Sequence, residues 1–377
     1  MGNPVYESQK INLEYSKSEI DRAACSIRHG CNGVARELAI AKIQNFREIH
    51  LYPLMLIKNH LARAANKVDP EIIIARRLKR LPTIIHKLER DTLDGINQNA
   101  IKLTRMQDIG GCRAIVKDLS YLRELQARLS KSKSVHKIIR TSNYLQPKPS
   151  GYSGVHLVYS CFDEDASNNH WKKTKIEVQL RTELQHAWAT SLEIVDTLEH
   201  IDLKTSLDGH EEWRRFFYVA GMLVAHDEGA NPLQYEQLKA FEIELFELEN
   251  HLNVLQKLLT FSVGIKATET DKKILNPKHN FGMCLITISK KDFQITGNRI
   301  KLQAGVEAFK QSEAQVALKA LNESENNSDI YLSVLLSTSD VRNLKKAYPN
   351  YFGSTSDFRK FLLKHIRHYR PQNIAKT

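Results

Sequence analysis

The chain has 377 residues and a formal net charge of +12 at pH 7, and hydrophobic residues make up 42% of it. This length predicts one large domain and a second, smaller one, and the composition is typical of a globular protein. The sequence offers no apolar run for a membrane span, no signal-peptide pattern and no CxxC pair among its five cysteines. We therefore expect a cytoplasmic protein without a membrane segment, a disulfide framework or a cysteine zinc site.

The first part of the chain is predicted to mix helices and strands. Helical periodicity indicates helices over 16–68, and Pro82 is expected to open a short helix that ends at Arg90. An amphipathic helix is predicted over 119–131. Apolar or alternating runs predict strands over 108–116, 138–145, 155–162 and 175–180. This order predicts an α+β fold, in which helices flank a mixed sheet.

The second part begins with three predicted helices, over 183–200, 211–229 and 233–260. The last helix has a seam of Leu and Phe at spacings of three and four, which favours packing on the protein's own core over a dimeric coiled coil. We therefore expect a monomer. Strands over 281–289 and 330–337 and helices over 304–322 and 356–368 predict a smaller α+β domain. The expected division is a first domain over 1–262, a linker over 263–280 and a second domain over 281–377.

Three segments carry residue types that suit phosphate chemistry. A basic cluster, Arg77-Leu-Lys79-Arg80, stands near a predicted helix start, where charge and free main-chain donors favour a polyphosphate. Asp108 precedes one predicted strand and Glu177 lies in another, and two such carboxylates can share a Mg²⁺ ion. Each segment alone is also typical of a solvated surface, a turn or a loop. Their occurrence together favours a nucleotide site.

The third segment is a Gly-rich loop, Lys148-Pro-Ser-Gly-Tyr152, which can bring main chain close to a ligand while the Tyr ring stacks on a base. The motifs Arg-x-Lys, Asp-x4-Arg, Lys-Pro-x-Gly-Tyr-x3-His and Glu-x-Gln-x-Arg-Thr follow one another between about Arg76 and His186. In order and spacing, this stretch closely resembles the synthetase domain of the RelA/SpoT alarmone synthetases. The resemblance implies an enzyme that transfers the β,γ-diphosphate of ATP to a ribose 3′-hydroxyl and releases AMP.

The resemblance also implies roles for individual residues. Asp108 and Glu177 are expected to be catalytic and to bind Mg²⁺, with Glu177 as the alternative base for the attacking hydroxyl. The residues expected to bind ATP are Arg77, Lys79, Arg80, Lys87 and Arg113. Those expected near the acceptor are Lys148, Tyr152, His156, Gln179, Arg181 and His186. Ser150 and Gly154 depart from the pattern of many family members, so the identity of the acceptor stays open.

The end of the chain contains Tyr348-Pro-Asn-Tyr351-Phe352, which is typical either of a local aromatic core or of an exposed aromatic plug. With the overall size, it resembles the fused toxin–antitoxin group called CapRel. That resemblance implies that Tyr348, Tyr351 and Phe352 hold the enzyme closed, that a phage protein such as the major capsid protein opens it, and that the open enzyme modifies the 3′ CCA end of tRNA in abortive infection.

Positive charge near the end of the chain agrees with a tRNA partner. Residues 275–377 contain 16 Lys and Arg against 8 Asp and Glu, and such a segment attracts a polyanionic backbone. Two alternatives remain: an alarmone synthetase that makes (p)ppGpp or (p)ppApp, and an inert binding protein. A solvated basic surface would also account for the charge.

Overall fold

The computed structural model describes residues 4–91, 101–134, 136–164, 169–199, 201, 203, 209–255, 258, 282–289, 294–296, 299–301, 304–338 and 356–369. The helices are α1 (Pro4–Glu7), α2 (Lys17–Arg28), α3 (Gly33–Glu48), α4 (Leu51–Ala65), α5 (Leu81–Glu89), α6 (Leu119–Lys131), α7 (Glu183–Glu199), α8 (Glu211–Asp227), α9 (Tyr235–Leu252), α11 (Ala314–Glu325) and α14 (Ser356–Ile366). Short 3-10 turns are η1 (Leu103–Arg105), η2 (Asn169–Trp171) and η3 (Gln311–Glu313). The strands are β1 (Ile73–Leu78), β2 (Gly110–Val116), β3 (Lys137–Asn143), β4 (Val155–Cys161), β5 (Thr174–Thr182), β6 (Met283–Ser289), β7 (Gln294–Thr296), β8 (Arg299–Lys301), β9 (Ala304–Phe309) and β10 (Ile330–Thr338).

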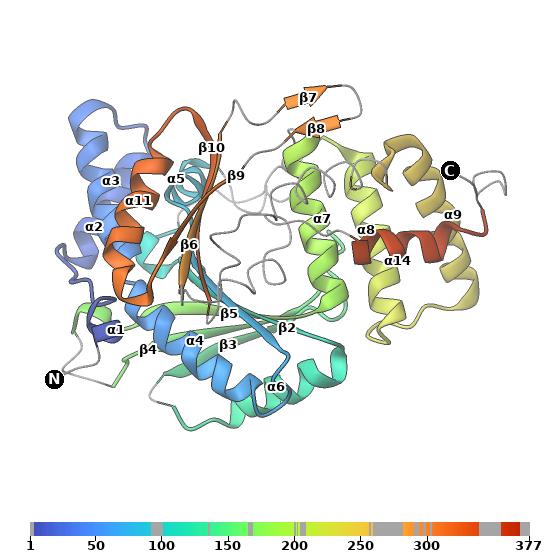
Figure 1. Ribbon diagram of the computed structural model, residues 1–377, viewed down its shortest axis with the longest axis horizontal. Coiled ribbons are helices and arrows are strands. Elements are labelled where there is room, and N and C mark those ends of the chain that lie inside the picture. The colour runs from blue at the N-terminus through green and yellow to red at the C-terminus, as the bar shows by residue number, and fades with distance from the viewer. Residues whose placement is uncertain are drawn as a thin grey trace.

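Within the described ranges, the main sheet has eight strands in the order β3-β4-β5-β2-β1-β10-β6-β9 (Figure 1). β2 and β5 run parallel, whereas each other neighbouring pair is antiparallel. The first five strands of this order form a mixed sheet, and helices flank it. The predicted α+β class with a mixed sheet is confirmed.

The C-terminal part of the chain continues this sheet. β10 pairs with β1, with Ala75 opposite Thr338 and Arg77 opposite Leu336. On the far side of β10 follow β6 and β9, and α11 packs against β10 and β6. The predicted linker over 263–280 lies outside the described residues.

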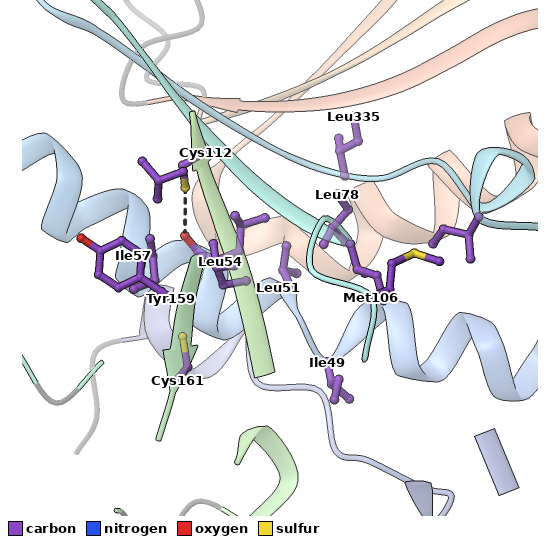
Figure 2. Packing of buried hydrophobic residues seen from close by; sticks show 14 of the residues in the cluster. Ile49, Leu51, Leu54, Ile57, Leu78, Met106, Cys112, Tyr159, Cys161 and Leu335 are labelled. Carbon is purple, nitrogen blue, oxygen red and sulfur yellow. Dashed lines mark hydrogen bonds between the residues drawn. The ribbon is translucent and has the colours of Figure 1, made fainter. Parts of the chain in front are cut away.

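Two hydrophobic clusters hold the elements together. The first joins the sheet to α2, α3, α4, α5, α6 and α11, and it includes Leu335 of β10 beside Leu78 of β1 (Figure 2). Cys112 of β2 belongs to it, with Sγ 3.9 Å from the carbonyl oxygen of Leu54 in α4. The second cluster joins α7, α8, α9 and α14, where Phe358 is fully buried and stacks on Phe217 at 6.5 Å between ring centroids. The C-terminal part therefore contributes to both clusters.

Most predicted elements of the first 230 residues are present, and three differences along the whole chain have clear causes. Residues 73–78 form β1, which the sequence did not suggest because two arginines interrupt its apolar pattern. Residues 304–309 form β9 and not the start of a helix, since pairing with β6 overrides their helical periodicity. The helix expected to reach residue 260 ends at Leu252, where Asn253 adopts a left-handed conformation. Its seam packs in the second cluster, as expected.

Candidate active site

Alternate residues of β1, β2 and β5 point into one cavity, because side chains on a strand alternate between the faces of a sheet. The cavity has a volume of about 210 Å³, and α7 contributes Glu193 to its wall. The opposite face of the same strands packs on α4 through residues such as Cys112. Seven of the residues predicted for the site line this cavity: Arg77, Lys79, Asp108, Arg113, Glu177, Gln179 and Arg181.

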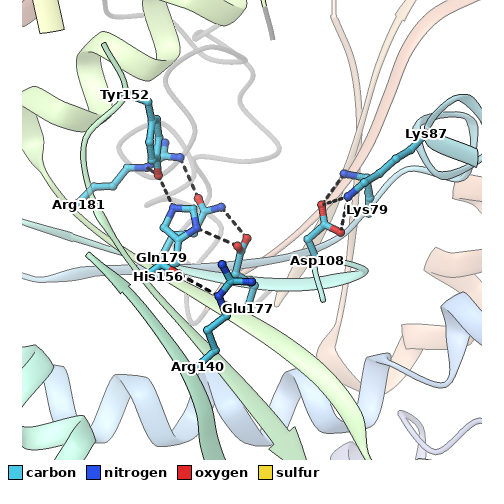
Figure 3. Close-up of polar contacts among 10 residues, drawn as sticks. Lys79, Lys87, Asp108, Arg140, Tyr152, His156, Glu177, Gln179 and Arg181 are labelled. Atoms are coloured by element: carbon cyan, nitrogen blue, oxygen red, sulfur yellow. Dashed lines mark hydrogen bonds and ion pairs between the residues drawn. The ribbon is translucent and has the colours of Figure 1, made fainter. Parts of the chain in front are cut away.

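On one side of the cavity, Asp108 contacts two lysines (Figure 3). The Nζ atom of Lys79 lies 2.9 Å from Oδ2 of Asp108, and that of Lys87 lies 3.3 Å from Oδ1. Burial alone would raise the pKa of Asp108, but the two positive charges outweigh it and lower that pKa to about 2. Burial also lowers the pKa of Lys79, and the negative charge of Asp108 offsets only part of this shift. Asp108 is therefore ionised at neutral pH and compensated by both lysines.

On the other side, Glu177 belongs to a chain of hydrogen bonds (Figure 3). Its Oε1 lies 2.9 Å from Nδ1 of His156, and its Oε2 accepts from Nε2 of Gln179 at 2.8 Å. The other ring nitrogen of His156 contacts the hydroxyl of Tyr152, to which Arg181 donates at 3.2 Å. Burial raises the pKa of Glu177, but its contacts with His156 and the hydrogen bond from Gln179 together outweigh burial, so the net shift is downward.

The loop that carries Tyr152 is fixed by its own main chain and by α8. Tyr144 and Gly154 exchange main-chain hydrogen bonds of 2.9 and 3.4 Å, which close the loop. A Cβ atom on Gly221 of α8 would lie 2.1 Å from the carbonyl oxygen of Gly151, so only glycine allows this approach. The Nζ atom of Lys148 lies 3.7 Å from the ring centroid of Tyr144 and 5.6 Å from that of Tyr152. The loop therefore presents two aromatic rings and one cation beside Glu177.

Two predicted residues are placed differently from the rest. Arg80 precedes α5 as its N-cap residue and is absent from the cavity lining; its charge acts on Glu325 of α11. His186, in α7, is 4% exposed, and neither ring nitrogen has a hydrogen-bond partner among the described residues. Burial, with Arg113 and Arg181 nearby, lowers the pKa of His186 well below 6.5. It therefore supports the wall of the cavity as a neutral ring.

The structure adds residues that the sequence analysis did not assign. Tyr144 stacks with Lys148 and opens the loop segment already singled out by its composition. Glu193 follows His186 by seven residues, a spacing that places both on one face of a helix and could have revealed it. Arg47 of α3 donates from Nε to the carbonyl oxygen of Lys79 at 2.8 Å, and no local pattern connects these two residues.

The comparison with protein families identifies the domain. Residues 76–194 match the model described as "Region found in RelA / SpoT proteins". This segment is a RelA/SpoT-type pyrophosphokinase domain. The match covers all of β2 and β5 and the last three residues of β1, so it includes every residue that lines the cavity except Ala75. The comparison with curated proteins gave no match.

Solved structures similar to this chain include small alarmone synthetase 1 from Bacillus subtilis bound to its product pppGpp, with 20% identity over 47% of this chain and 88% of that chain and a TM-score of 0.38. A GTP pyrophosphokinase family protein from Streptococcus pneumoniae has 21% identity over 49% and 89%, with a TM-score of 0.38. Small alarmone synthetase 2 from Bacillus subtilis has 20% identity over 56% and 96%, with a TM-score of 0.36. At such identities and TM-scores, the assignment depends on the family match.

Several expectations fall outside what the structure describes. The residues predicted to be autoinhibitory, Tyr348, Tyr351 and Phe352, lie in a segment outside the described residues.

Among the described helices, none is both long and apolar enough to cross a membrane. The described residues also contain no group of three or more His, Cys, Asp or Glu side chains arranged for a metal ion.

Proposed function

We propose that this pyrophosphokinase transfers the β,γ-diphosphate of ATP to the 3′-hydroxyl of a tRNA, and that its C-terminal part keeps the reaction off until a phage protein binds. The observation that carries the transfer reaction is the pair of unlike walls of one cavity. One wall combines Asp108 with two lysines, and the other combines Glu177 with His156. A phosphate donor and a hydroxyl acceptor need these two environments side by side.

The lysine wall suits ATP. Three cations would neutralise the phosphates. Lys79 and Lys87 contact Asp108, and Arg77 lines the same cavity. Asp108 and Glu177 would hold Mg²⁺, an ion that takes hard oxygen ligands and is commonly bound by one or two carboxylates together with substrate phosphates. The donor set fits, since both carboxyl groups are ionised and face the same cavity. Bound Mg²⁺ would neutralise charge that develops on the phosphates.

The Glu177 wall suits the acceptor hydroxyl. In the proposed step the hydroxyl oxygen forms a bond to the β-phosphorus, the bond from the β-phosphorus to the bridging α–β oxygen breaks, and AMP leaves with those electrons. The proton of the hydroxyl passes to Glu177, whose lowered pKa keeps it ionised at neutral pH. Tyr152, held by His156 and Arg181, would stack on the base of the acceptor.

The choice of tRNA as acceptor is supported by charge. The chain carries +12, and residues 275–377 contain 16 Lys and Arg against 8 Asp and Glu. Part of this charge is paired within the protein, since Lys364 of α14 lies 2.6 Å from Asp227 of α8. The alternative is a small alarmone synthetase that uses GDP, GTP or ATP as acceptor with the same cavity.

One assay tests both proposals. Purified full-length protein is incubated with ATP labelled on the β- or γ-phosphate, with tRNA, GDP, GTP or ATP as acceptor, and with or without Tyr351→Ala or the phage capsid protein. We expect label on tRNA, about 10-fold or more above the basal level when Tyr351 is replaced or the capsid protein is present. Label on GDP, GTP or ATP alone would favour the alarmone synthetase. Equal activity of a folded Tyr351→Ala variant and the wild type would contradict autoinhibition by this residue.

A further inference from the structure

A buried arginine connects the C-terminal part of the chain to the lysine wall of the cavity. The side chain of Arg47 in α3 is 0% exposed. Its Nη2 lies 3.6 Å from Oε1 of Glu325, the last residue of α11, and its Nη1 donates to Oδ1 of Asn322 at 3.2 Å. The side chain of Glu325 is 3% exposed. The charge of Arg47 is thus compensated by a helix that lies almost 280 positions later in the chain.

The same guanidinium group fixes the main chain of Lys79. Nε of Arg47 donates to the carbonyl oxygen of Lys79 at 2.8 Å, and the N–H of Lys79 donates to the carbonyl oxygen of Ile109 at 2.7 Å. Both peptide groups of Lys79 are therefore held, one by Arg47 and one by the residue that follows Asp108. This arrangement sets the direction in which the side chain of Lys79 leaves the end of β1 toward Asp108.

Lys87, the other lysine that contacts Asp108, depends on the region around Arg47 and Glu325 as well. α5 begins at Leu81 and carries Lys87. The carboxylate of Glu325 lies close to the main-chain N–H of Leu81 although neither of its oxygens forms a hydrogen bond, and a negative charge is favourable at the start of a helix. The pair formed by Arg47 and Glu325 thus lies between the two segments that supply the partners of Asp108.

A buried ion pair is sensitive to the loss of either member, because the remaining charge then lacks both water and a partner. If α11 moved away, Arg47 would lose Glu325 and Asn322 together. β10, which follows α11, pairs with β1 at Ala75 and Arg77, so the same motion would disturb the strand itself. The C-terminal part therefore supports the arrangement of the lysine wall from two directions.

We propose that Arg47 is a positioning residue for Lys79 and α5, that Glu325 holds Arg47 in place, and that α11 is consequently required for transfer. This inference rests on the proposed function for its effect on activity. It also specifies the regulation, because the activating step must leave α11 docked and act elsewhere in the C-terminal part. Release of α11 would lower transfer and not raise it.

The experiment compares Arg47→Lys, Glu325→Gln and the control Glu323→Gln in the full chain. Arg47→Lys keeps the charge but removes the Nε–H that donates to the carbonyl oxygen of Lys79. Glu323 lies on the same helix, and its side chain is 68% exposed beside Lys319. Amide hydrogen exchange over residues 76–82 reports the main chain of Lys79 without depending on activity. We expect exchange about 10-fold faster in the first two variants and unchanged in the control.

Transfer is measured in the same variants in the open form of the enzyme. We expect a loss of about 10-fold in kcat for Arg47→Lys and Glu325→Gln, and no further loss when Arg47→Lys is added to Lys79→Ala, because the two residues act as one unit. Unchanged exchange, a higher rate for Glu325→Gln, or multiplied losses in the double variant would overturn the inference. If the wild type transfers label to no acceptor, the proposed function fails and the exchange result alone decides this inference.

Discussion

The two carboxylates of the cavity are held in different ways. Asp108 is compensated by full charges, with Lys79 at 2.9 Å and Lys87 at 3.3 Å; Lys79 directly follows β1, and Lys87 lies in α5. Glu177 is held by His156 and Gln179, which lie on adjacent antiparallel strands. Its support is therefore built within one pair of strands, whereas the support of Asp108 extends through Arg47 to α11.

This difference indicates which parts of the protein can change each wall. The Glu177 wall depends on β4, on β5 and on the loop around Tyr152, which packs against α8. All of these lie in the region from 144 to 221. The Asp108 wall depends on residues from both ends of the chain. A change at α11 would therefore reach the ATP side of the cavity first, whereas a change at α14 would reach the acceptor side through Phe217 of α8.

The largest effect is expected from the carboxylates themselves. Asp108→Asn and Glu177→Gln should each lower the rate of diphosphate transfer by about 100-fold or more, because one removes charge beside the phosphates and the other removes the base. Single-turnover transfer measures the rate, and titration calorimetry measures ATP binding. Asp108→Asn should leave ATP bound, since the two lysines remain. Comparable activity of either folded variant and the wild type would refute its catalytic role.

A smaller effect should separate the two walls. Lys87→Met should raise KM for ATP by about 10-fold with little change in KM for the acceptor, because a phosphate partner is lost. His156→Gln should mainly lower kcat or raise KM for the acceptor, because it removes the hydrogen bonds that hold Glu177 and Tyr152 in place. Steady-state kinetics with each substrate varied in turn gives these constants. The same KM pattern in both variants would contradict the division into walls.

The contact between the acceptor loop and α8 provides a third test. Gly221→Ala should displace the loop, since its Cβ would lie 2.1 Å from the carbonyl oxygen and 2.6 Å from the Cα of Gly151. We expect transfer to fall by about 10-fold or more, while the affinity for ATP stays within about 2-fold. The melting temperature should fall by several degrees, and ATP binding serves as the internal control. Loss of ATP binding in a folded variant would show that the walls are not independent.

The smallest effect is expected in the pH dependence of stability. Burial lowers the pKa of His50 to about 4, and burial also lowers that of His186. Below about pH 6.5 the unfolded chain binds protons that the folded protein excludes. The free energy of unfolding should therefore decrease as the pH is lowered from about 6.5 to about 4. His50 alone should contribute up to about 1.4 kcal/mol per pH unit in this window. Denaturant unfolding of the wild type and His50→Gln at pH 7, 6 and 5 checks this, and equal slopes would contradict it.

Some of these features could be predicted from residues close together in the chain. The period-two pattern of β5 already places Glu177, Gln179 and Arg181 on one face, because alternation on a strand is a local property. β1 was missed, because its arginines interrupt the apolar pattern, yet Arg76 is only 1% exposed and packs within the protein. The strand character of residues 304–309 comes from pairing with β6, a contact that propensity cannot indicate.

By itself, the sequence determined the class of the fold, the order of its motifs and the chemical types that meet in the cavity, since these follow from local periodicity and from residues fixed by their spacing. Only the tertiary structure decided how the walls are supported. It placed β10 beside β1, Glu325 beside Arg47, and Gly151 against Gly221. These contacts join distant segments through pairing, burial of charge and close main-chain approach, and none of them leaves a pattern within a single stretch of sequence.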